Sequence, residues 1–455
     1  MSRSSCARVQ WLTIWLGCLF VVTQILSTSH GGFCGAGFRN RSVGGIAIDA
    51  HGVVSLPTRE DRSLFLKTIR ERTPKTPDAM TAPVGLRRIS LRKLDEAIRT
   101  ARRDRHGMLP DEINYLAGLQ RIEYVLVYPE ERDIVLAGPG EGWTVNEQGD
   151  VVGVTTGRPV LHLDDLLVAL RSTSDARAEG ITLSIDPTEE GRRNLDSYLK
   201  KVKQFSPAAV AGMEKALGPQ QISVTGVPVD SHFARVMLAA DFHMKRIAMQ
   251  LDPSPIEELP SFVQMMQQSR TRPTNLMPRW WLACDYKPLS RSEDGLAWRL
   301  DGGVKAMTED EIVTSGSVTG TGKANPLAQK WADQMTKNYE QLSVKQAAFG
   351  HLRNLMDMCV VAALIEKEDL LGLAGLTAPT LLSDEAALEV ITWHAPKSIA
   401  TQCSFLRAGR EWIVTASGGV DIDPWQVVAK SEVDDQVAPI RAKSTPAADA
   451  PWWWN

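Results

Sequence analysis

The spacing of apolar and polar residues predicts strands and helices in mixed order along the chain. Residues 42–56 alternate on both sides of Ala50-His51-Gly52, which is typical of a strand, a turn and a second strand. Residues 86–105 carry apolar side chains every three or four positions, which predicts a helix with one buried face. Further strands are expected at 121–128, 133–137, 143–154 as a hairpin, 181–185 and 222–227. Further helices are expected at 60–72, 163–171, 189–204, 207–217 and 231–240.

The second half of the chain contains a long helical block between two groups of strands. Strands are predicted at 280–285 and 296–300, and residues 326–373 are almost entirely helical in pattern. Within this block, residues 352–364 are apolar on nearly every side, which indicates a buried helix. A strand group follows at 388–428.

The patterns together predict an α+β protein with mixed strands and helices in two or three packed units. The length of 455 residues agrees with more than one unit. The expected segments are a signal peptide at 1–29, an N-terminal hairpin, helix and linker at 30–83, an α+β domain at 84–275, a domain of strands flanking the helical block (about 326–373) at 276–428, and a tail at 429–455. The tail is rich in Ala, Pro, Asp and Lys, and we expect it to be disordered.

The first thirty residues predict export from the cytoplasm. Arg3 and Arg8 form a basic start, residues 9–26 are almost wholly apolar, and Ser27 and Ser29 occupy the small-residue positions of a cleavage site. An uncleaved anchor is the alternative, because about 18 apolar residues can just span a bilayer. With cleavage, we expect a periplasmic or extracellular protein without a membrane span, free or associated with the envelope.

Composition narrows the choice of partners and of covalent links. A net charge of -3 gives no reason to expect nucleic acid, and 43% hydrophobic with 23% charged residues is typical of folded domains. Export permits disulfides, and four cysteines follow the signal segment. We expect one disulfide at most, between Cys284 and Cys403, since both lie in strand-like segments. Cys359 lies in an apolar run, which indicates a buried thiol.

Known catalytic motifs are absent from the sequence or have the wrong spacing. The loop 316–325 resembles a phosphate-binding loop, but Ser317 replaces its first glycine and Ala324 replaces the hydroxyl that binds magnesium, so we interpret it as a linker. Paired acids at several turns and helix starts offer too many candidates to select a glycosidase pair. The sequence therefore predicts no cofactor.

The segment from Asp230 to His243 contains Asp-Ser-His and then, eleven residues later, Asp-Phe-His. On one helix His232 and His243 would share a face but lie about 16 Å apart, too far for one metal ion. Ser231 with His232 could form a nucleophile and base, but a helix N-cap at Asp230 or Ser231 is the simpler interpretation. We keep Asp230 and His232 as weak binding candidates and predict no metal site.

Two other groups of residues are candidates for binding. Arg99, Arg102 and Arg103 belong to a strongly basic helix that could contact an anionic envelope polymer, and a solvated helix is the alternative. Trp280 and Trp281 are adjacent in a predicted strand and should face opposite sides. An exposed tryptophan could bind a sugar or a partner, whereas a neighbouring element could equally cover it.

Several long blocks of the chain are distinctive, namely RIEYVLVYPEERDIVLAGPGEGW at 121–143, GRPVLHLDDLLVALR at 157–171, VTGVPVDSHFARVMLAADFHMKRIAM at 224–249, PRWWLACDY at 278–286, ANPLAQKWADQMTKNYEQL at 324–342 and SGGVDID at 417–423. Together they resemble an uncharacterised domain-of-unknown-function family of exported planctomycete proteins. The resemblance covers most of the chain after the signal segment and implies no activity, cofactor or catalytic residue. Cys284 departs from the family pattern, which weakens the expected disulfide.

The sequence thus predicts an exported, non-catalytic binding or structural protein of the bacterial cell envelope. Its expected partners are an anionic envelope polymer or another envelope protein. The alternative is an exported hydrolase of glycans or esters that uses carboxylates far apart in sequence. Two carboxylates about 5 to 9 Å apart in a cleft would favour the hydrolase, and an exposed Trp280 or Trp281 on an open sheet would favour binding.

Overall fold

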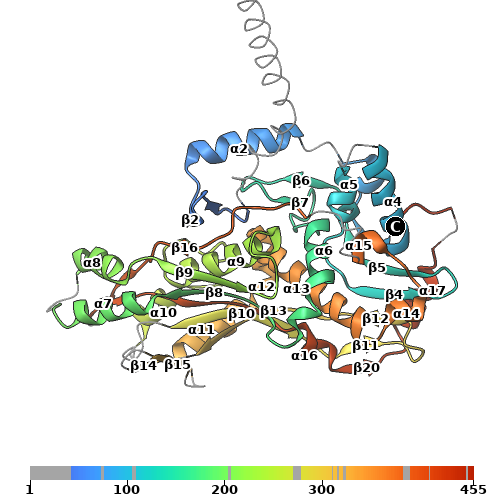
Figure 1. Cartoon of the computed structure of the whole chain (residues 1–455). Coiled ribbons are helices and arrows are strands. Elements are labelled where there is room, and N and C mark those ends of the chain that lie inside the picture. Colours follow the sequence, from blue (N-terminus) through green and yellow to red (C-terminus); the bar gives the residue numbers. More distant parts are fainter. Residues whose placement is uncertain are drawn as a thin grey trace, which may run out of the picture. The chain divides into compact units, whose positions relative to one another are not determined.

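Two large sheets and the helices packed on them make up the described part of the chain (Figure 1). The computed structural model describes residues 43–72, 76–104, 109–202, 206–269, 278–309, 311–314, 317–320, 324–382, 390–408, 410–446 and 449–455. The predicted signal peptide at 1–29 lies outside the described residues. Helices and mixed sheets both contribute substantially, so the predicted α+β class is confirmed.

The larger sheet has eight strands in the order β1-β2-β16-β9-β8-β19-β10-β13. Their bounds are β1 Ala47–Ile48, β2 Val53–Ser55, β16 Ser398–Ile399, β9 Gln220–Thr225, β8 Ile181–Pro187, β19 Ser417–Ile422, β10 Arg279–Tyr286 and β13 Gly302–Glu309. The strand β19 runs parallel to β10 and antiparallel to β8. The second and third residues of β19, Gly418 and Gly419, have to be glycine, because a Cβ would collide with the backbone of Trp280 and of Leu183, respectively. The predicted hairpin at 42–56 is confirmed as the antiparallel pair β1 and β2.

The second sheet has seven strands in the order β20-β11-β12-β4-β5-β3-β21. Their bounds are β20 Ser431–Val433, β11 Leu289–Arg291, β12 Ala297–Arg299, β4 Tyr124–Tyr128, β5 Asp133–Gly140, β3 Val84–Ser90 and β21 Trp453–Trp454. Both large sheets combine strands from the predicted segments 84–275 and 276–428, so these two segments share their sheets. Three strand pairs complete the set, namely β6 Trp143–Val145 with β7 Val151–Gly153, β14 Glu311–Thr314 with β15 Ser317–Gly320, and β17 Ser404–Ala408 with β18 Arg410–Val414.

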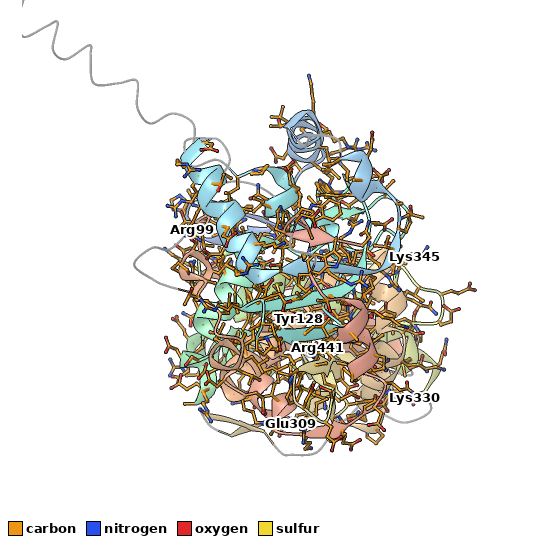
Figure 2. All side chains as sticks on the ribbon, turned by 90° about the vertical axis from the view of Figure 1, so that its right-hand side faces the viewer. Arg99, Tyr128, Glu309, Lys330, Lys345 and Arg441 are labelled. Carbon is orange, nitrogen blue, oxygen red and sulfur yellow. The ribbon has the colours of Figure 1, made fainter. Side chains whose placement is uncertain are left out.

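The tail that the composition predicts to be disordered forms both edges of the seven-stranded sheet. Arg441 stacks over the Tyr128 ring at 5.1 Å, and its Nε donates a hydrogen bond to the Val127 carbonyl at 2.7 Å (Figure 2). The Tyr128 hydroxyl donates in return to the Arg441 carbonyl at 2.7 Å. At one edge of the sheet β20 pairs with β11, and at the other edge Trp453 of β21 pairs with Ile89 of β3. The described parts of the tail, residues 429–446 and 449–455, are therefore held by long-range contacts to the sheet, which replace the apolar core that the tail's composition lacks.

The helix α13 (Ala347–Lys367) lies at the centre of the helical layer and confirms the buried helix predicted at 352–364. It packs against α6 (Leu163–Ser172), α9 (His232–Ala248) and α12 (Tyr339–Lys345). Among the described residues it is the one helix whose length and apolar composition would suffice to cross a membrane. Its apolar window is entirely buried inside the protein, as expected of a core helix.

The other helices cover the sheets or connect the strands. They are α2 Arg59–Arg72, α3 Asp78–Thr81, α4 Leu91–Asp104, α5 Asp111–Asn114, α7 Glu189–Leu199, α8 Pro207–Leu217, α10 Phe262–Gln268, α11 Pro326–Lys337, α14 Leu370–Ala374, α15 Pro379–Leu382, α16 Pro424–Val428 and α17 Ala438–Lys443, with 3-10 turns η2 Leu116–Gly118 and η3 Asp175–Arg177. The helix predicted at 86–105 begins only at Leu91. Its first residues form β3 instead, because they pair with β5, and Ser90 Oγ accepts the Lys93 N–H at the start of α4.

Candidate functional site

Imidazoles and carboxylates from distant parts of the chain gather where α6, α9 and α13 meet. Two of these helices begin at the site, because His162 is the N-cap of α6 and His232 is the first residue of α9. Asp165 lies in the first turn of α6, and His351 lies near the start of α13. We call His162, Asp165, His232 and His351 the histidine cluster.

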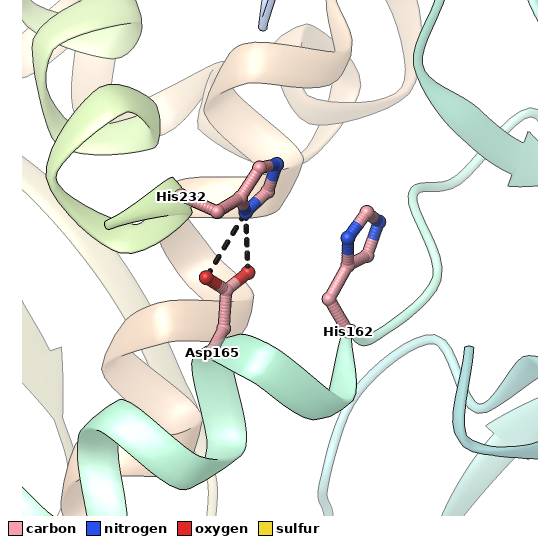
Figure 3. A group of neighbouring side chains, drawn as sticks. All are labelled: His162, Asp165 and His232. Carbon is pink, nitrogen blue, oxygen red and sulfur yellow. Dashed lines mark hydrogen bonds and ion pairs between the residues drawn. The ribbon is translucent and has the colours of Figure 1, made fainter. Parts of the chain in front are cut away.

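Asp165 and His232 form the closest contact of the histidine cluster (Figure 3). Nδ1 of His232 lies 3.0 and 2.9 Å from the two carboxylate oxygens of Asp165. Both side chains are buried, with 2% of Asp165 and 7% of His232 exposed. Ser231 caps α9 through the Ala234 N–H, which confirms the predicted N-cap and sets the position of His232. The carboxylate therefore holds the imidazole in one orientation and leaves Nε2 directed away from it.

Two further imidazoles pack against His232. The His162 ring lies nearly parallel to it, with centroids 4.7 Å apart and an interplanar angle of 10°. His351 stands edge-on to both rings, at 5.2 Å from His162 and 6.1 Å from His232. Nε2 of His162 is buried and has no hydrogen-bond partner among the described residues. The histidine cluster therefore contains a buried imidazole nitrogen that receives no hydrogen bond from, and donates none to, the described residues.

Burial and neighbouring charge set opposite protonation states within the histidine cluster. Burial lowers the pKa of His162 well below its ordinary value and lowers the pKa of His351 to about 3. Burial also opposes the charged form of His232, but the Asp165 carboxylate outweighs it and raises the pKa of His232. The charge of Asp165 thus favours the protonated form of His232, whereas burial favours the neutral forms of His162 and His351.

Two more carboxylates stand close enough to influence the histidine cluster. Burial, together with the charge of Asp165, raises the pKa of Asp164 to about 6. Burial also raises the pKa of Asp150, whose Oδ1 accepts the Gly44 N–H at 3.0 Å. The Gly44 carbonyl is in turn bonded to Nε2 of His243 at 2.6 Å. Gly44, just before β1, is therefore hydrogen-bonded both to His243 of α9 and to the Asp150 carboxylate beside the histidine cluster.

The loop 390–397 covers His232 with Trp393. The indole ring lies 5.9 Å from the His232 ring, and the Arg235 guanidinium stacks over it at 4.8 Å. The backbone N–H of Trp393 donates a hydrogen bond to the Asp230 carbonyl at 2.7 Å. Asp230 thus anchors the loop through its backbone. Nε1 of Trp393 is a second buried nitrogen without a partner among the described residues.

The predicted tryptophan pair separates onto the two faces of β10, as expected. Trp280 is fully buried, edge-on to Phe262 at 5.0 Å and next to Trp331 at 4.9 Å. Trp281 is partly buried on the opposite face, with the Arg279 guanidinium 5.8 Å from its ring. Trp280 is therefore a core residue and is excluded as a direct binding residue.

The three arginine candidates are exposed residues of α4, and Figure 2 labels Arg99. Arg99 forms an ion pair with Asp95 at 3.1 Å, and Arg103 forms one with Asp104 at 3.1 Å. Arg102 is also exposed. The acidic neighbours partly neutralise this surface, so its positive field is weaker than the sequence count indicates.

The predicted disulfide between Cys284 and Cys403 is wrong, because both residues are free thiols. Cys403 packs in a separate small core with Leu195 and Met213, whereas Cys284 lies on β10 against the main core. Cys359 is a buried free thiol of α13, as predicted. Cys34 lies outside the described residues.

Sequence reasoning found one member of the histidine cluster and missed three. His232 was selected because of its repeated motif, and its supposed partner His243 is bonded to Gly44 instead. Asp165 was visible only as half of an acidic pair at a helix start. His351 carried a usable signal, since it is a polar residue within the long, buried apolar helix α13.

Comparison with known proteins assigns no chemistry to the site. Residues 183–262 match the sequence model of a family described as a protein of unknown function, DUF1598. This match runs from β8 to the start of α10 and includes His232, but it does not extend to His162, Asp165 or His351. Comparison with curated proteins and with solved structures found no significant match.

Proposed function

We propose that this protein is an exported ligand-binding protein of the bacterial cell envelope and that the histidine cluster is its binding site. The observation that carries the proposal is a buried group of imidazoles and carboxylates in which some polar atoms have no hydrogen-bond partner among the described residues. Buried polar atoms are costly unless they are hydrogen-bonded, and nearly all of them are bonded in folded proteins. A ligand that contacts His162 Nε2 and Trp393 Nε1 would remove this cost.

The location rests on the N-terminal sequence. The basic start, apolar run and small-residue exit in residues 1–29 favour export. The resemblance to exported planctomycete proteins supports the same location. Arg99, Arg102 and Arg103 offer an exposed surface through which the protein would attach to an anionic envelope polymer.

An exported hydrolase is the second candidate, and the Asp165–His232 pair favours it. A carboxylate that orients a histidine through Nδ1 leaves Nε2 to act as a general base. Ser231 does not supply the nucleophile, because its hydroxyl donates to the Pro228 carbonyl at 2.6 Å. Within the described ranges, no serine, threonine or cysteine side chain donates a hydrogen bond to His232. A hydrolase would therefore have to activate water, and binding is the simpler function.

Cell fractionation and envelope capture test the proposal. The full chain is expressed in a bacterium, the exported fraction is collected and the N-terminus of the purified protein is sequenced. That protein is then incubated with cell envelopes and the retained material is identified. We expect export, cleavage near residue 29, and retention of an envelope component that His232→Ala reduces at least tenfold.

The matched control is His51→Ala, which removes an exposed histidine from the turn between β1 and β2. It should bind like the wild type. Retention of the chain in the cytoplasm, or equal capture by the wild type and His232→Ala, would overturn the proposal. Turnover of a glycan or ester by the wild type and not by His232→Ala would establish the hydrolase instead.

A further inference from the structure

We propose that the ligand of the histidine cluster is a divalent transition-metal ion of the zinc type, held by His162, Asp165 and His232. This inference rests on the proposed function, since it names the ligand of that site. One nitrogen or oxygen atom from each of these three residues lies within 4.8 Å of the other two. The three residues come from two helix starts that the fold brings together.

The distances agree with a site that needs only small adjustments, in which His162 moves closer and the Asp165–His232 contact lengthens slightly. Zinc binds imidazole nitrogen and carboxylate oxygen at about 2.0 to 2.2 Å in tetrahedral geometry, so neighbouring ligand atoms lie about 3.4 Å apart. Nδ1 of His232 and the Asp165 oxygens are already 2.9 and 3.0 Å apart. His162 is the ligand that has to approach, since the ligand atoms of the group lie within 4.8 Å of one another and the other two are already closer than that. On binding, the proton shared between Asp165 and His232 passes to solvent, and both atoms become ligands.

The donor types select the class of ion. Two imidazoles and one carboxylate suit zinc and related late first-row ions, whereas calcium and magnesium require mainly oxygen ligands. Among the described residues no further histidine, cysteine, aspartate or glutamate joins this ligand group. Three protein ligands leave a fourth position open, which is the arrangement of exchangeable and catalytic zinc sites rather than closed structural ones. A carboxylate or hydroxyl of an envelope component can occupy that position.

The surrounding structure holds the proposed ligands in place. His162 and Asp165 are three residues apart at the start of α6, so they project from the same side of its first turn. Ser231 fixes the first turn of α9 and with it His232. The edge-on contacts of His351 with both imidazoles limit their rotation. Ligands supported in this way on helix ends lose little freedom when an ion binds.

Metal binding to the purified protein tests this inference. Tag-free protein from the exported fraction is stripped with a chelator and titrated with Zn²⁺ and with Co²⁺, whose visible spectrum reports tetrahedral nitrogen and oxygen ligands. We expect one bound ion per chain and a higher thermal midpoint with Zn²⁺. His162→Ala, Asp165→Asn and His232→Gln should each weaken binding by more than about 100-fold, since loss of even an outer-shell partner costs about 10 to 100-fold. His51→Ala is the matched control and should bind like the wild type.

The outcomes separate this inference from the proposed function. His162 is the more exposed of the two imidazole ligands, so His162→Ala is the variant best suited to remain folded, which circular dichroism verifies. A wild type that binds no ion, or variants that bind as the wild type does, would overturn the metal site. Envelope capture without metal binding would overturn the metal inference alone, whereas metal binding without envelope capture would overturn the proposed function alone.

Discussion

Asp165 and His232 are 67 residues apart in sequence, yet Nδ1 of His232 lies within 3.0 Å of both oxygens of the Asp165 carboxylate. The two residues sit at the starts of α6 and α9, which meet beside α13. Burying such a pair costs desolvation free energy. Removing one partner destabilises the protein further, because the other stays buried without its ion-pair or hydrogen-bond partner. The pair therefore links the stability of the fold to the chemistry of the site.

Replacement of Asp165 should destabilise the protein strongly. We expect Asp165→Ala to lower the free energy of unfolding by about 3 to 5 kcal/mol, because His232 keeps its burial and loses its partner. Asp165→Asn should cost less, since the amide oxygen still accepts the His232 proton. Urea unfolding measures both. Asp196→Ala breaks the exposed Lys200–Asp196 pair and should cost less than about 1 kcal/mol. Equal losses at the two positions would contradict the prediction.

His351 should make the fold sensitive to acid. Its pKa is about 3 in the folded protein and about 6.5 in the unfolded chain, so between these values the unfolded chain takes up a proton that the folded protein refuses. Stability is therefore lost as the pH falls below about 6.5, by about 2 kcal/mol at pH 5. Denaturant unfolding from pH 7 to pH 5 should show a smaller loss in His351→Gln than in the wild type. The control His51→Gln should keep the wild-type slope.

Gly44 should tolerate no side chain. Its φ is +57°, and a Cβ would lie 2.7 Å from Ala239 Cβ on α9 and 3.0 Å from Ala348 Cβ on α13. Gly375, at the end of α14, is left-handed with a φ of +62°, and the nearest atom to such a Cβ is Arg132 Cγ at 3.9 Å, an ordinary contact. We expect Gly375→Ala to cost about 1 kcal/mol from backbone strain, and Gly44→Ala to cost a further 1 to 3 kcal/mol, approximately, from overpacking. Thermal unfolding distinguishes the two, and equal midpoints would show that the contact is absent.

The exposed arginines of α4 should govern attachment to the envelope. Reversal of Arg99, Arg102 and Arg103 to Glu should weaken envelope binding at low salt, and high salt should weaken the wild type to the same level, since the Debye length is about 10 Å at 0.1 M. Co-sedimentation with envelopes measures this. Reversal of Arg193, Lys200 and Lys201 makes the same change of charge near α7 and should have a smaller effect. Binding that is insensitive to both sets would exclude an electrostatic attachment through α4.

Local patterns in the sequence were sufficient for much of the secondary structure. The hairpin at 42–56, the strands β4 and β5, the helix α8 and the Ser231 cap all follow from residues adjacent in the chain. The buried helix α13 follows from a run of apolar residues that no amphipathic surface helix would carry. These features depend on periodicity and on capping chemistry, which are encoded within about one or two turns of chain.

Tertiary structure alone decided which of these elements meet. The residues next to His232 in sequence do not predict its contact with Asp165. The residues next to Cys403 do not show that it lies in a different core from Cys284. Residues 431–433 and 453–454 are placed by long-range strand pairing, because β11 and β3 offer free edges to β20 and β21. The sequence by itself determined most of the helices and strands through local patterns, and it predicts an export signal. The histidine cluster arose from the packing of α6, α9 and α13, because long-range contacts depend on the whole core and not on the spacing of neighbouring residues.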